Sequence, residues 1–272
     1  MTDRTGILKK SPLIYALASI RFAPWPLMAQ KIDEIHDDLR DITPLIHKIQ
    51  IGQVGPSGQA VIQNEVAITA AWVLVSSDRS FGFLLTPDQM LFFSKKYTRY
   101  VDFETNIEKG LDVLLKYMRF LDVTNQGVRY VDHIKTIKEE SLELYISSEL
   151  LPANFDNLVR IGGTTLGIYK SGDAELRVRC TSQPDASTIP DDIISLLALF
   201  QEPGMPLRLE MLQSNELLLD IDALKNYPTP QRMKNKEDIL SRLKSLHYEA
   251  NVFFRNDSVC TDHAFKVWKD EF

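Results

Sequence analysis

The most informative absences in this 272-residue sequence are the motifs of the common enzyme classes. It contains no glycine-rich phosphate loop, no Gly-x-Ser-x-Gly elbow, no His-Glu-x-x-His and no Cys-x-x-Cys. Gly162 and Gly163 are an isolated pair and fall far short of a nucleotide-binding fingerprint. No motif therefore argues for catalysis, and we expect neither a cofactor nor a resident metal.

Cysteine is almost missing. Cys180 and Cys260 stand alone, without a paired or metal-type spacing, which is typical of reduced thiols in a reducing compartment. The first ten residues lack the apolar core and small-residue cleavage site of a secretory signal. No apolar run approaches the roughly 18 residues of a membrane span. We therefore expect a cytoplasmic protein that does not enter a membrane.

An excess of positive charge is also missing. The chain has 31 Lys and Arg against 37 Asp and Glu, a formal net charge of −6. Binding to nucleic acid is disfavoured, because neutralising phosphates requires clustered basic residues, although a local basic patch would escape this argument. Apolar residues make up 44% and charged residues 25%, so the composition is that of a globular protein with a core.

What the sequence does contain is a pattern of strands followed by a long amphipathic helix, and this pattern occurs twice. The first set has strands at 13–22, 66–75, 81–85, 90–93 and 127–134, with helices at 27–42 and 105–121. The strands at 66–93 are apolar on both faces, as in a sheet that is covered on both sides. A turn-rich loop is expected at 52–58, and Thr105 with Glu108 resembles a capping box.

The second set begins near residue 141. Strands are predicted at 142–147, 164–169, 174–181, 207–212 and 216–221, and a helix follows Pro190. Segment 226–231 is read as a linker before a second long helix at 236–254, and Thr261 is placed to cap a short last helix. We predict an α+β fold with two pseudo-repeated halves, 1–137 and 138–272, each a mostly antiparallel sheet backed by amphipathic helices. One continuous domain is the alternative.

Charged side chains alternate with apolar ones on the strands of the second half. The face opposite the apolar residues carries acids and arginines: Glu175, Arg177, Arg179, Arg208, Glu210, Asp220 and Asp222. Asp220, Asp222 and Glu210 are candidate ligands of a catalytic divalent cation, and Arg177, Arg179 and Arg208 are candidates for binding an anionic ligand. The alternative is a solvated sheet face with cross-strand ion pairs, which is what such a face normally shows.

Three other features have both a structural and a functional interpretation. The five histidines do not cluster, and Asp132 and His133 point to opposite faces of one strand, which is poor catalytic geometry. Trp25 and Trp268 are candidate anchors for a partner, although packing over the ends of the core is the commoner role. The acidic face of helix 27–42 is either a solvated face or a contact for a basic protein surface.

Several stretches together resemble a sporadically distributed family of uncharacterised bacterial proteins of about this length. They are 12–22 (PLIYALASIRF), 127–132 (GVRYVD), 218–222 (LLDID) and 246–254 (LHYEANVFF), followed by Thr261. Asp132 stands where this family more usually has Asn. The resemblance implies no catalytic residue. The patchy distribution of the family points to defence, toxin–antitoxin or mobile-element systems.

The sequence favours a non-enzymatic protein-binding or regulatory factor. A metal-dependent phosphoester or nucleotide-processing enzyme that uses the Asp220-x-Asp222 strand is the alternative. A protein partner is expected, and homo-oligomerisation stays open.

Overall fold

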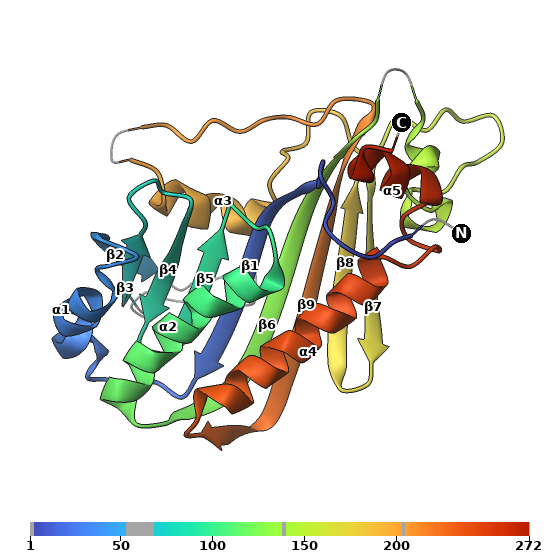
Figure 1. Ribbon diagram of the computed structural model, residues 1–272. Coiled ribbons are helices and arrows are strands. Elements are labelled where there is room, and N and C mark those ends of the chain that lie inside the picture. The colour runs from blue at the N-terminus through green and yellow to red at the C-terminus, as the bar shows by residue number, and fades with distance from the viewer. Residues whose placement is uncertain (1–2, 53–67, 138–139, 203–204, 272) are drawn as a thin grey trace, which may run out of the picture.

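The computed structural model describes residues 3–52, 68–137, 140–202 and 205–271, and these residues form one large antiparallel sheet with five α-helices (Figure 1). The strands are β1 (Leu13–Phe22), β2 (Leu45–Gly52), β3 (Ile68–Val75), β4 (Phe81–Thr86), β5 (Gln89–Ser94), β6 (Leu121–Lys135), β7 (Thr164–Ser171), β8 (Ala174–Thr181) and β9 (Glu216–Met233). The α-helices are α1 (Met28–Leu39), α2 (Tyr100–Met118), α3 (Asp191–Leu199), α4 (Lys236–Phe254) and α5 (Asp262–Lys269).

The strand order is β2-β3-β4-β5-β1-β6-β9-β8-β7, so the sheet is built outward from the central pair β1 and β6. Each of these two strands has an antiparallel neighbour on either side, β5 beyond β1 and β9 beyond β6. Strands from residues before 137 and after 140 therefore belong to one hydrogen-bonded sheet. The α+β class and the antiparallel sheet are confirmed.

Helices α2 and α4 lie side by side across one face of the sheet (Figure 1). Their apolar stripes are buried there, with Ile107, Leu111 and Leu114 on α2 and Ile239 and Leu243 on α4. Both stripes repeat at three- and four-residue steps, which puts their side chains on one side of each helix. The larger hydrophobic core lies between these helices and the sheet.

Only part of the opposite face is covered. Helix α3 packs Ile193, Leu197 and Phe200 against β3, β4 and β5, whose alternate residues, such as Val73 and Leu84, form a second core. The apolar pattern of strands 66–93 predicted a sheet covered on both sides. The structure confirms this for the described part of the region, where both faces are buried. Helix α3 is encoded after residue 190, yet it covers strands from the first third of the chain.

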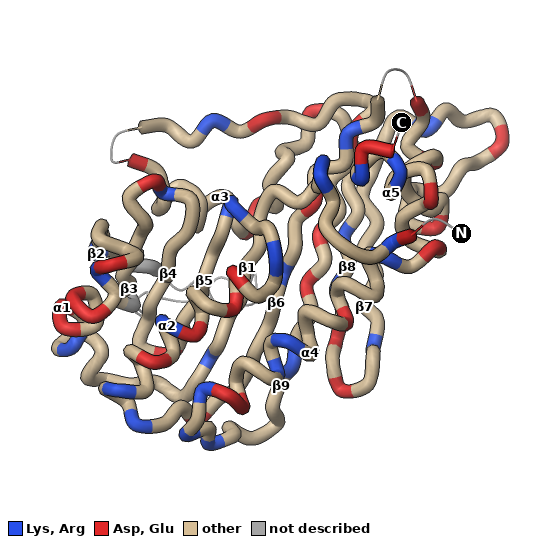
Figure 2. Tube along the Cα trace, viewed as in Figure 1, with Lys and Arg blue, Asp and Glu red and all other residues tan. Residues whose placement is uncertain are grey.

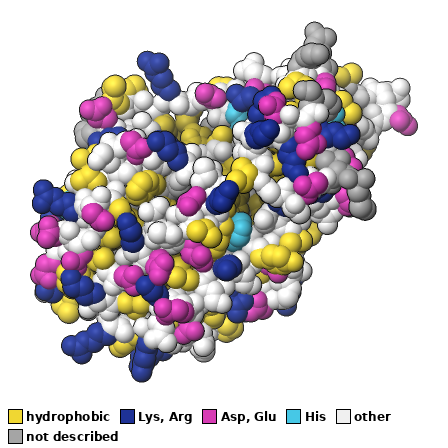
Figure 3. Space-filling model, in the orientation of Figure 1, with side chains coloured by type: hydrophobic (Ala, Val, Ile, Leu, Met, Phe, Trp, Pro, Cys, Tyr) yellow, Lys and Arg dark blue, Asp and Glu magenta, His cyan; other side chains and the backbone are white. Residues whose placement is uncertain are grey.

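Helix α1 contains several acidic residues (Figure 2), and two of them form ion pairs with lysines of other elements. Lys116 of α2 donates to Asp38 at 2.6 Å, and Lys48 of β2 donates to Asp33 at 2.9 Å. The face with α2 and α4 shows basic and acidic side chains intermingled, without a large patch of one sign (Figure 3). None of the helices that the structure describes is both long enough and apolar enough to span a membrane.

The predicted start of the helix 105–121 needs correction. Helix α2 begins at Tyr100, and Thr105 lies inside it, where its hydroxyl donates to the carbonyl of Val101 one turn earlier. A capping-box sequence also fits a helix interior when the preceding residues continue the helix. Residues 53–58 of the predicted loop and 66–67 of the predicted strand lie outside the described residues.

The second half differs from prediction in three places. Segment 142–147 holds a 3₁₀ turn, Leu142–Leu144, and 207–212 makes one isolated bridge, Met211 to Ser187, so neither is a strand of the sheet. The predicted linker 226–231 is part of β9. Asn226 pairs with Asn125 and Gln231 with Val123, so residues 227–230 bulge opposite the single residue 124. A bulge leaves the ladder unpaired, which is why it tolerates two prolines.

Candidate functional site

The face of the sheet opposite α2 and α4, which we call the groove face, is hollowed beside α3 into a groove of about 410 Å³. Its floor comes from five strands, β5, β1, β6, β9 and β8, in their order across the sheet. The polar side chains that line it are Ser19, Arg21, Gln89, Asn125, Arg129, Arg177, Asp222 and Asn226. The charged face predicted on the C-terminal strands is thus one side of a concave surface that extends to β1.

Strand alternation and register bring these side chains together. Residues two apart point to the same face, as with Asn125, Gly127 and Arg129 on β6. Across the sheet, Arg129 and Arg177 both lie opposite Asp222, one on each side of β9. Further along, Arg21 of β1 lies opposite Asn125. The groove therefore follows directly from pairing of strands that are distant in sequence.

Arg129 makes four hydrogen bonds to carboxylate oxygens at this surface. Its guanidinium donates to both carboxylate oxygens of Asp220, at 2.7 and 2.8 Å, and to both oxygens of Asp192 on α3, at 2.5 and 3.0 Å. These hydrogen bonds hold the pKa of Asp192 below its usual value. Asp220 is only 4% exposed, so its charge is compensated by Arg129 and not by water.

The same helix is tied down at its other end. Arg79, in the β3–β4 turn, donates to the carbonyls of Phe200 and Gln201 at 3.3 and 2.8 Å, where α3 leaves carbonyl groups without helical partners. Arg79 has a positive φ of 53°. Arg129 therefore holds the start of α3 and Arg79 its end, and Arg129 links the helix to the groove lining.

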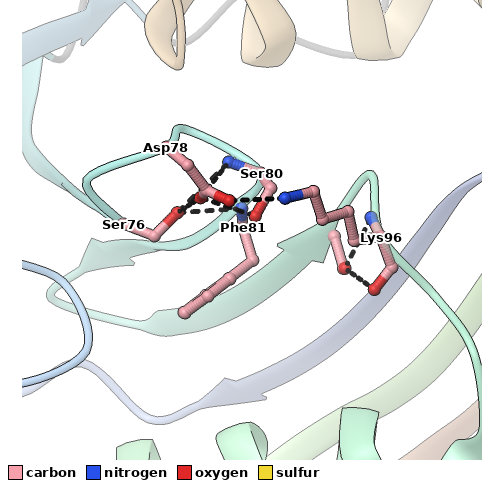
Figure 4. Close-up of polar contacts among 6 residues, drawn as sticks. Ser76, Asp78, Ser80, Phe81 and Lys96 are labelled. Atoms are coloured by element: carbon pink, nitrogen blue, oxygen red, sulfur yellow. Dashed lines mark hydrogen bonds and ion pairs between the residues drawn. The ribbon is translucent and has the colours of Figure 1, made fainter.

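The β3–β4 turn that presents Arg79 is organised by one carboxylate (Figure 4). Asp78 accepts from the hydroxyls of Ser76 and Ser80 at 2.8 and 2.7 Å and from the Lys96 ammonium at 2.6 Å. The lysine bond, followed by the serine bonds, lowers the pKa of Asp78. An aspartate that satisfies neighbouring groups in this way is typical of a tight, ordered turn.

Asp222 is a carboxylate in the groove lining whose hydrogen-bonding capacity the described chain leaves open. It is half-buried, and within the part of the chain that the structure describes its carboxylate accepts no hydrogen bond. Burial raises the pKa of Asp222 to about 6, with the charge of Asp220 adding to the effect and that of Arg129 opposing it. The groove thus contains an acceptor that a ligand is able to pair with at neutral pH.

The structure separates the three carboxylates predicted to hold a cation. Asp220 and Asp222 share a face of β9, but Arg129 occupies both oxygens of Asp220. Glu210 lies in the irregular segment after residue 205, is exposed, and approaches Lys135 at 3.8 Å. Among the described residues there is no group of three or more His, Cys, Asp or Glu side chains arranged to hold a metal ion. Glu210 was misplaced because 207–212 alternates like a strand without joining the sheet.

Of the three predicted arginines, two lie on the sheet face and one does not. Arg177 is exposed at the groove and donates to Glu175 on its own strand at 2.7 Å. Arg179 is half-buried on the same face and lies opposite Asp220. Arg208 belongs to the irregular segment and is exposed, so it does not share the sheet face with the other two.

The two tryptophans have different environments. Trp268 is 3% exposed and stacks on Phe254 with ring centroids 5.4 Å apart, so its ring is part of the core and is not a surface anchor in this conformation. Trp25 is half-buried against the core, with part of its ring accessible. A role of Trp25 in partner binding stays a prediction.

Asp132 and His133 lie on opposite faces of β6, as strand geometry predicts. His133 meets the carboxylate of Glu216 at 3.0 Å on the groove side of the sheet. Asp132 is 4% exposed on the helix side, and burial, reinforced by the charge of Asp220, raises its pKa to about 8. Asp132 therefore does not orient His133 as the carboxylate of a catalytic pair would.

Sequence reasoning missed the contribution of the first half to this site. Arg21 and Arg129 each stand between two apolar residues of a strand, and that departure from the pattern was the available signal; Asn125 lies between Thr124 and Gln126 and gave none. The signal was not usable alone, because only the pairing of β1 with β6 and of β6 with β9 puts these residues beside Asp222.

Comparison with protein-family models and with curated proteins finds no match for this chain.

Proposed function

We propose that this chain is a binding or regulatory protein that holds a segment of a protein partner in the groove on the face of its sheet opposite α2 and α4. The observation that carries the proposal is Asp222, a half-buried carboxylate on the floor of an open polar groove that accepts no hydrogen bond from the described residues. A carboxylate at a concave surface that the chain itself leaves unpaired is a place for a ligand donor.

The lining favours a polypeptide over a single anion. Asp222 is an acceptor, Arg21 and Arg177 are donors, and the amides of Gln89, Asn125 and Asn226 provide both. An extended chain offers alternating N–H and C=O groups, which match such a mixed surface. A phosphate would match the arginines but would be repelled by Asp222 when that group is ionised.

A pull-down from the native host, followed by mass spectrometry, tests the proposal. We expect specific partners with the wild-type chain and their loss with the double variant Arg21→Glu/Arg177→Glu. The matched control is Arg99→Glu/Lys244→Glu, which reverses two exposed charges outside the groove. Equal capture by both double variants would contradict the proposal.

The pH dependence of capture provides a second readout. The pKa of Asp222 is raised to about 6, so its carboxylate is charged near pH 8 and mostly neutral near pH 5. Binding through a donor to Asp222 should weaken over that range, and in Asp222→Asn this dependence should be absent. The same pH dependence in both proteins would exclude Asp222 as the acceptor.

The metal-dependent phosphoester or nucleotide enzyme is the second candidate, and Asp222 is the only one of its three carboxylates that is available at the sheet face. We expect the melting temperatures of the wild-type chain and of Asp222→Ala to respond in the same way to Mg²⁺ or Mn²⁺. An Asp222-dependent rise would favour the enzyme instead.

We also propose that the sheet arose by internal duplication. Outward from the centre, β1-β5-β4-β3 corresponds to β6-β9-β8-β7. Helix α2 follows β5, α4 follows β9, and each has 19 residues on the same face. Helix α1 and strand β2 have no counterpart in this scheme. A superposition that left these paired elements unmatched would contradict it.

The proposed setting is the bacterial cytoplasm, in keeping with two free buried cysteines and with the family that the sequence resembles. A link to defence, toxin–antitoxin or mobile-element systems stays a prediction. Identification of a partner encoded by such a system would support it.

A further inference from the structure

Strand β7 is an edge of the sheet with an exposed apolar surface. Beyond it Figure 1 shows no further strand or helix. Leu166 and Ile168 are each 63% exposed, and both point to the groove face of the sheet, opposite Arg179 and Arg177 of β8. The preceding segment adds Phe155, Leu158, Val159 and Ile161, which are 66 to 89% exposed. The exposed large apolar side chains of the chain are concentrated here.

Among the described residues, the backbone groups on the outer side of β7 have no strand partner, and they follow a defined pattern. β7 and β8 are joined by a two-residue turn closed by Ser171 and Ala174, with Gly172 at φ 57°. The closing pair of such a hairpin exchanges hydrogen bonds, and the pattern then alternates. Tyr169, Gly167 and Thr165 therefore bond to β8. The N–H and C=O groups of Lys170, Ile168, Leu166 and Thr164 point outward.

We propose that β7 pairs antiparallel with β7 of a second copy of this chain, on a two-fold axis at Gly167. In this register Leu166 lies opposite Ile168 of the other copy, twice, and Thr164 lies opposite Lys170. All four residues with outward backbone groups become hydrogen-bonded pairs, about eight bonds in total. An isologous contact of this kind closes as a dimer.

Self-complementarity is what selects a second copy as the occupant. Lys170 is the only charged residue of β7, and the two-fold axis at Gly167 places it away from its own symmetry mate. Apolar residues meet apolar residues, which stabilises cross-strand pairs. An edge that carries exposed Leu and Ile without a central charge, bulge or proline is unprotected in a monomer.

The other edge of the sheet is different. β2 has Lys48 in its middle, and this side chain is held by Asp33 of α1. A charge in the middle of an edge strand is a common protection against pairing. The contrast between the two edges favours β7 as the single dimer contact, which gives a closed pair of chains and not a filament.

Sedimentation equilibrium over a wide range of protein concentration tests the dimer. We expect Leu166→Lys/Ile168→Lys to raise the dissociation constant by at least about tenfold, since it places charges opposite one another. The matched control is Leu209→Lys/Met211→Lys, which alters two exposed apolar residues of another segment and should leave the constant unchanged. A wild-type chain that is monomeric at every concentration overturns the proposal.

A backbone variant separates strand pairing from apolar contact. Ile168→Pro removes an outward N–H and leaves the bonds between β7 and β8 intact, because Ile168 is not bonded to β8. We expect a folded monomer by circular dichroism and sedimentation. A dimer as strong as that of the wild type would overturn pairing through β7.

Disulfide trapping tests the register itself. Hydrogen-bonded antiparallel pairs have Cα atoms about 5.5 Å apart, within the range for a disulfide. A mixture of Leu166→Cys and Ile168→Cys chains should form mixed disulfide dimers faster than either variant alone. The native Cys180 and Cys260 are buried and contribute little background. Faster linking within a single variant would exclude the axis at Gly167, and no linking in any combination would exclude the dimer.

Discussion

At the scale of single residues, two buried aspartates on neighbouring strands have opposite electrostatic environments. Asp220 is paired with Arg129 at 2.7 Å. Asp132 faces the core between the sheet and the helices, and burial, reinforced by Asp220, raises its pKa to about 8. At neutral pH Asp132 is therefore mostly protonated.

We predict that Asp132→Asn flattens the dependence of stability on pH. Between about pH 4 and pH 8 the folded protein holds a proton on Asp132 that the unfolded chain releases, so its stability falls as pH rises. The slope approaches about 1.4 kcal/mol per pH unit within this window. Urea denaturation of both proteins at several pH values measures it. A stability difference that stays constant from pH 4 to pH 8 would contradict the raised pKa.

We predict that Arg129→Met destabilises the protein more than the double variant Arg129→Met/Asp220→Asn does. The single change leaves a carboxylate at 4% exposure without its partner. Breaking a buried pair in this way costs about 3–5 kcal/mol. Chemical denaturation of the two variants and the wild type gives the comparison. If the double variant were the less stable, Asp220 would have another partner that compensates its charge.

At the scale of elements, the position of α3 depends on a glycine. A Cβ atom at Gly82 of β4 would lie 2.3 Å from the carbonyl oxygen of Leu74 and 2.5 Å from the ring of Phe200. Phe200 is fully buried at the end of α3 and packs on Phe93 with ring centroids 4.9 Å apart. The close approach of helix and sheet is therefore available only to a residue without a side chain.

We predict that Gly82→Ala destabilises the protein by about 1–3 kcal/mol, as overpacked cores do. The contact with a backbone carbonyl cannot be relieved by a side-chain rotation, so α3 or β4 must move. Denaturation measures the cost, and amide hydrogen exchange of α3 locates it. Unchanged exchange in α3 together with unchanged stability would contradict this account of Gly82.

Long amphipathic elements were predictable because their periodicity is local. Helix α4 was predicted with its exact bounds, and the cap of α5 by Thr261 was also correct, with the hydroxyl accepting from the N–H of Ala264. The errors fall where a local signal and a distant partner disagree. Pro228 and Pro230 indicated a linker, but the bulge opposite β6 accommodates them. The groove combines residues from β1 to β9, and no local pattern encodes which strands become neighbours.

At the scale of the whole molecule, the two sequence halves depend on each other. β6 lies before residue 137 and pairs with β9 of the later part, while α3 of the later part buries β3, β4 and β5. Separated at residue 137, the first fragment would expose the apolar surface beneath α3, and the second would begin with an uncovered edge at β9.

We predict that fragments 1–137 and 138–272 do not fold separately but recover structure when mixed. Each would leave a large apolar surface in water, with a cost that rises with its area. Dispersion of amide signals in two-dimensional NMR spectra, before and after mixing, measures the outcome. A well-dispersed spectrum from either fragment alone would show that it is an independent domain.

The central place of β1 has a consequence for how this chain reaches its structure. During synthesis β1 leaves the ribosome long before β5 and β6, the two strands between which it must fit. Contacts between segments so distant in sequence slow folding, because a long stretch of chain must be ordered before they form. We therefore expect slow folding with a late step that closes the middle of the sheet. Until that step, the apolar β1 is exposed and can associate with other chains. A chaperone is therefore most needed during this period.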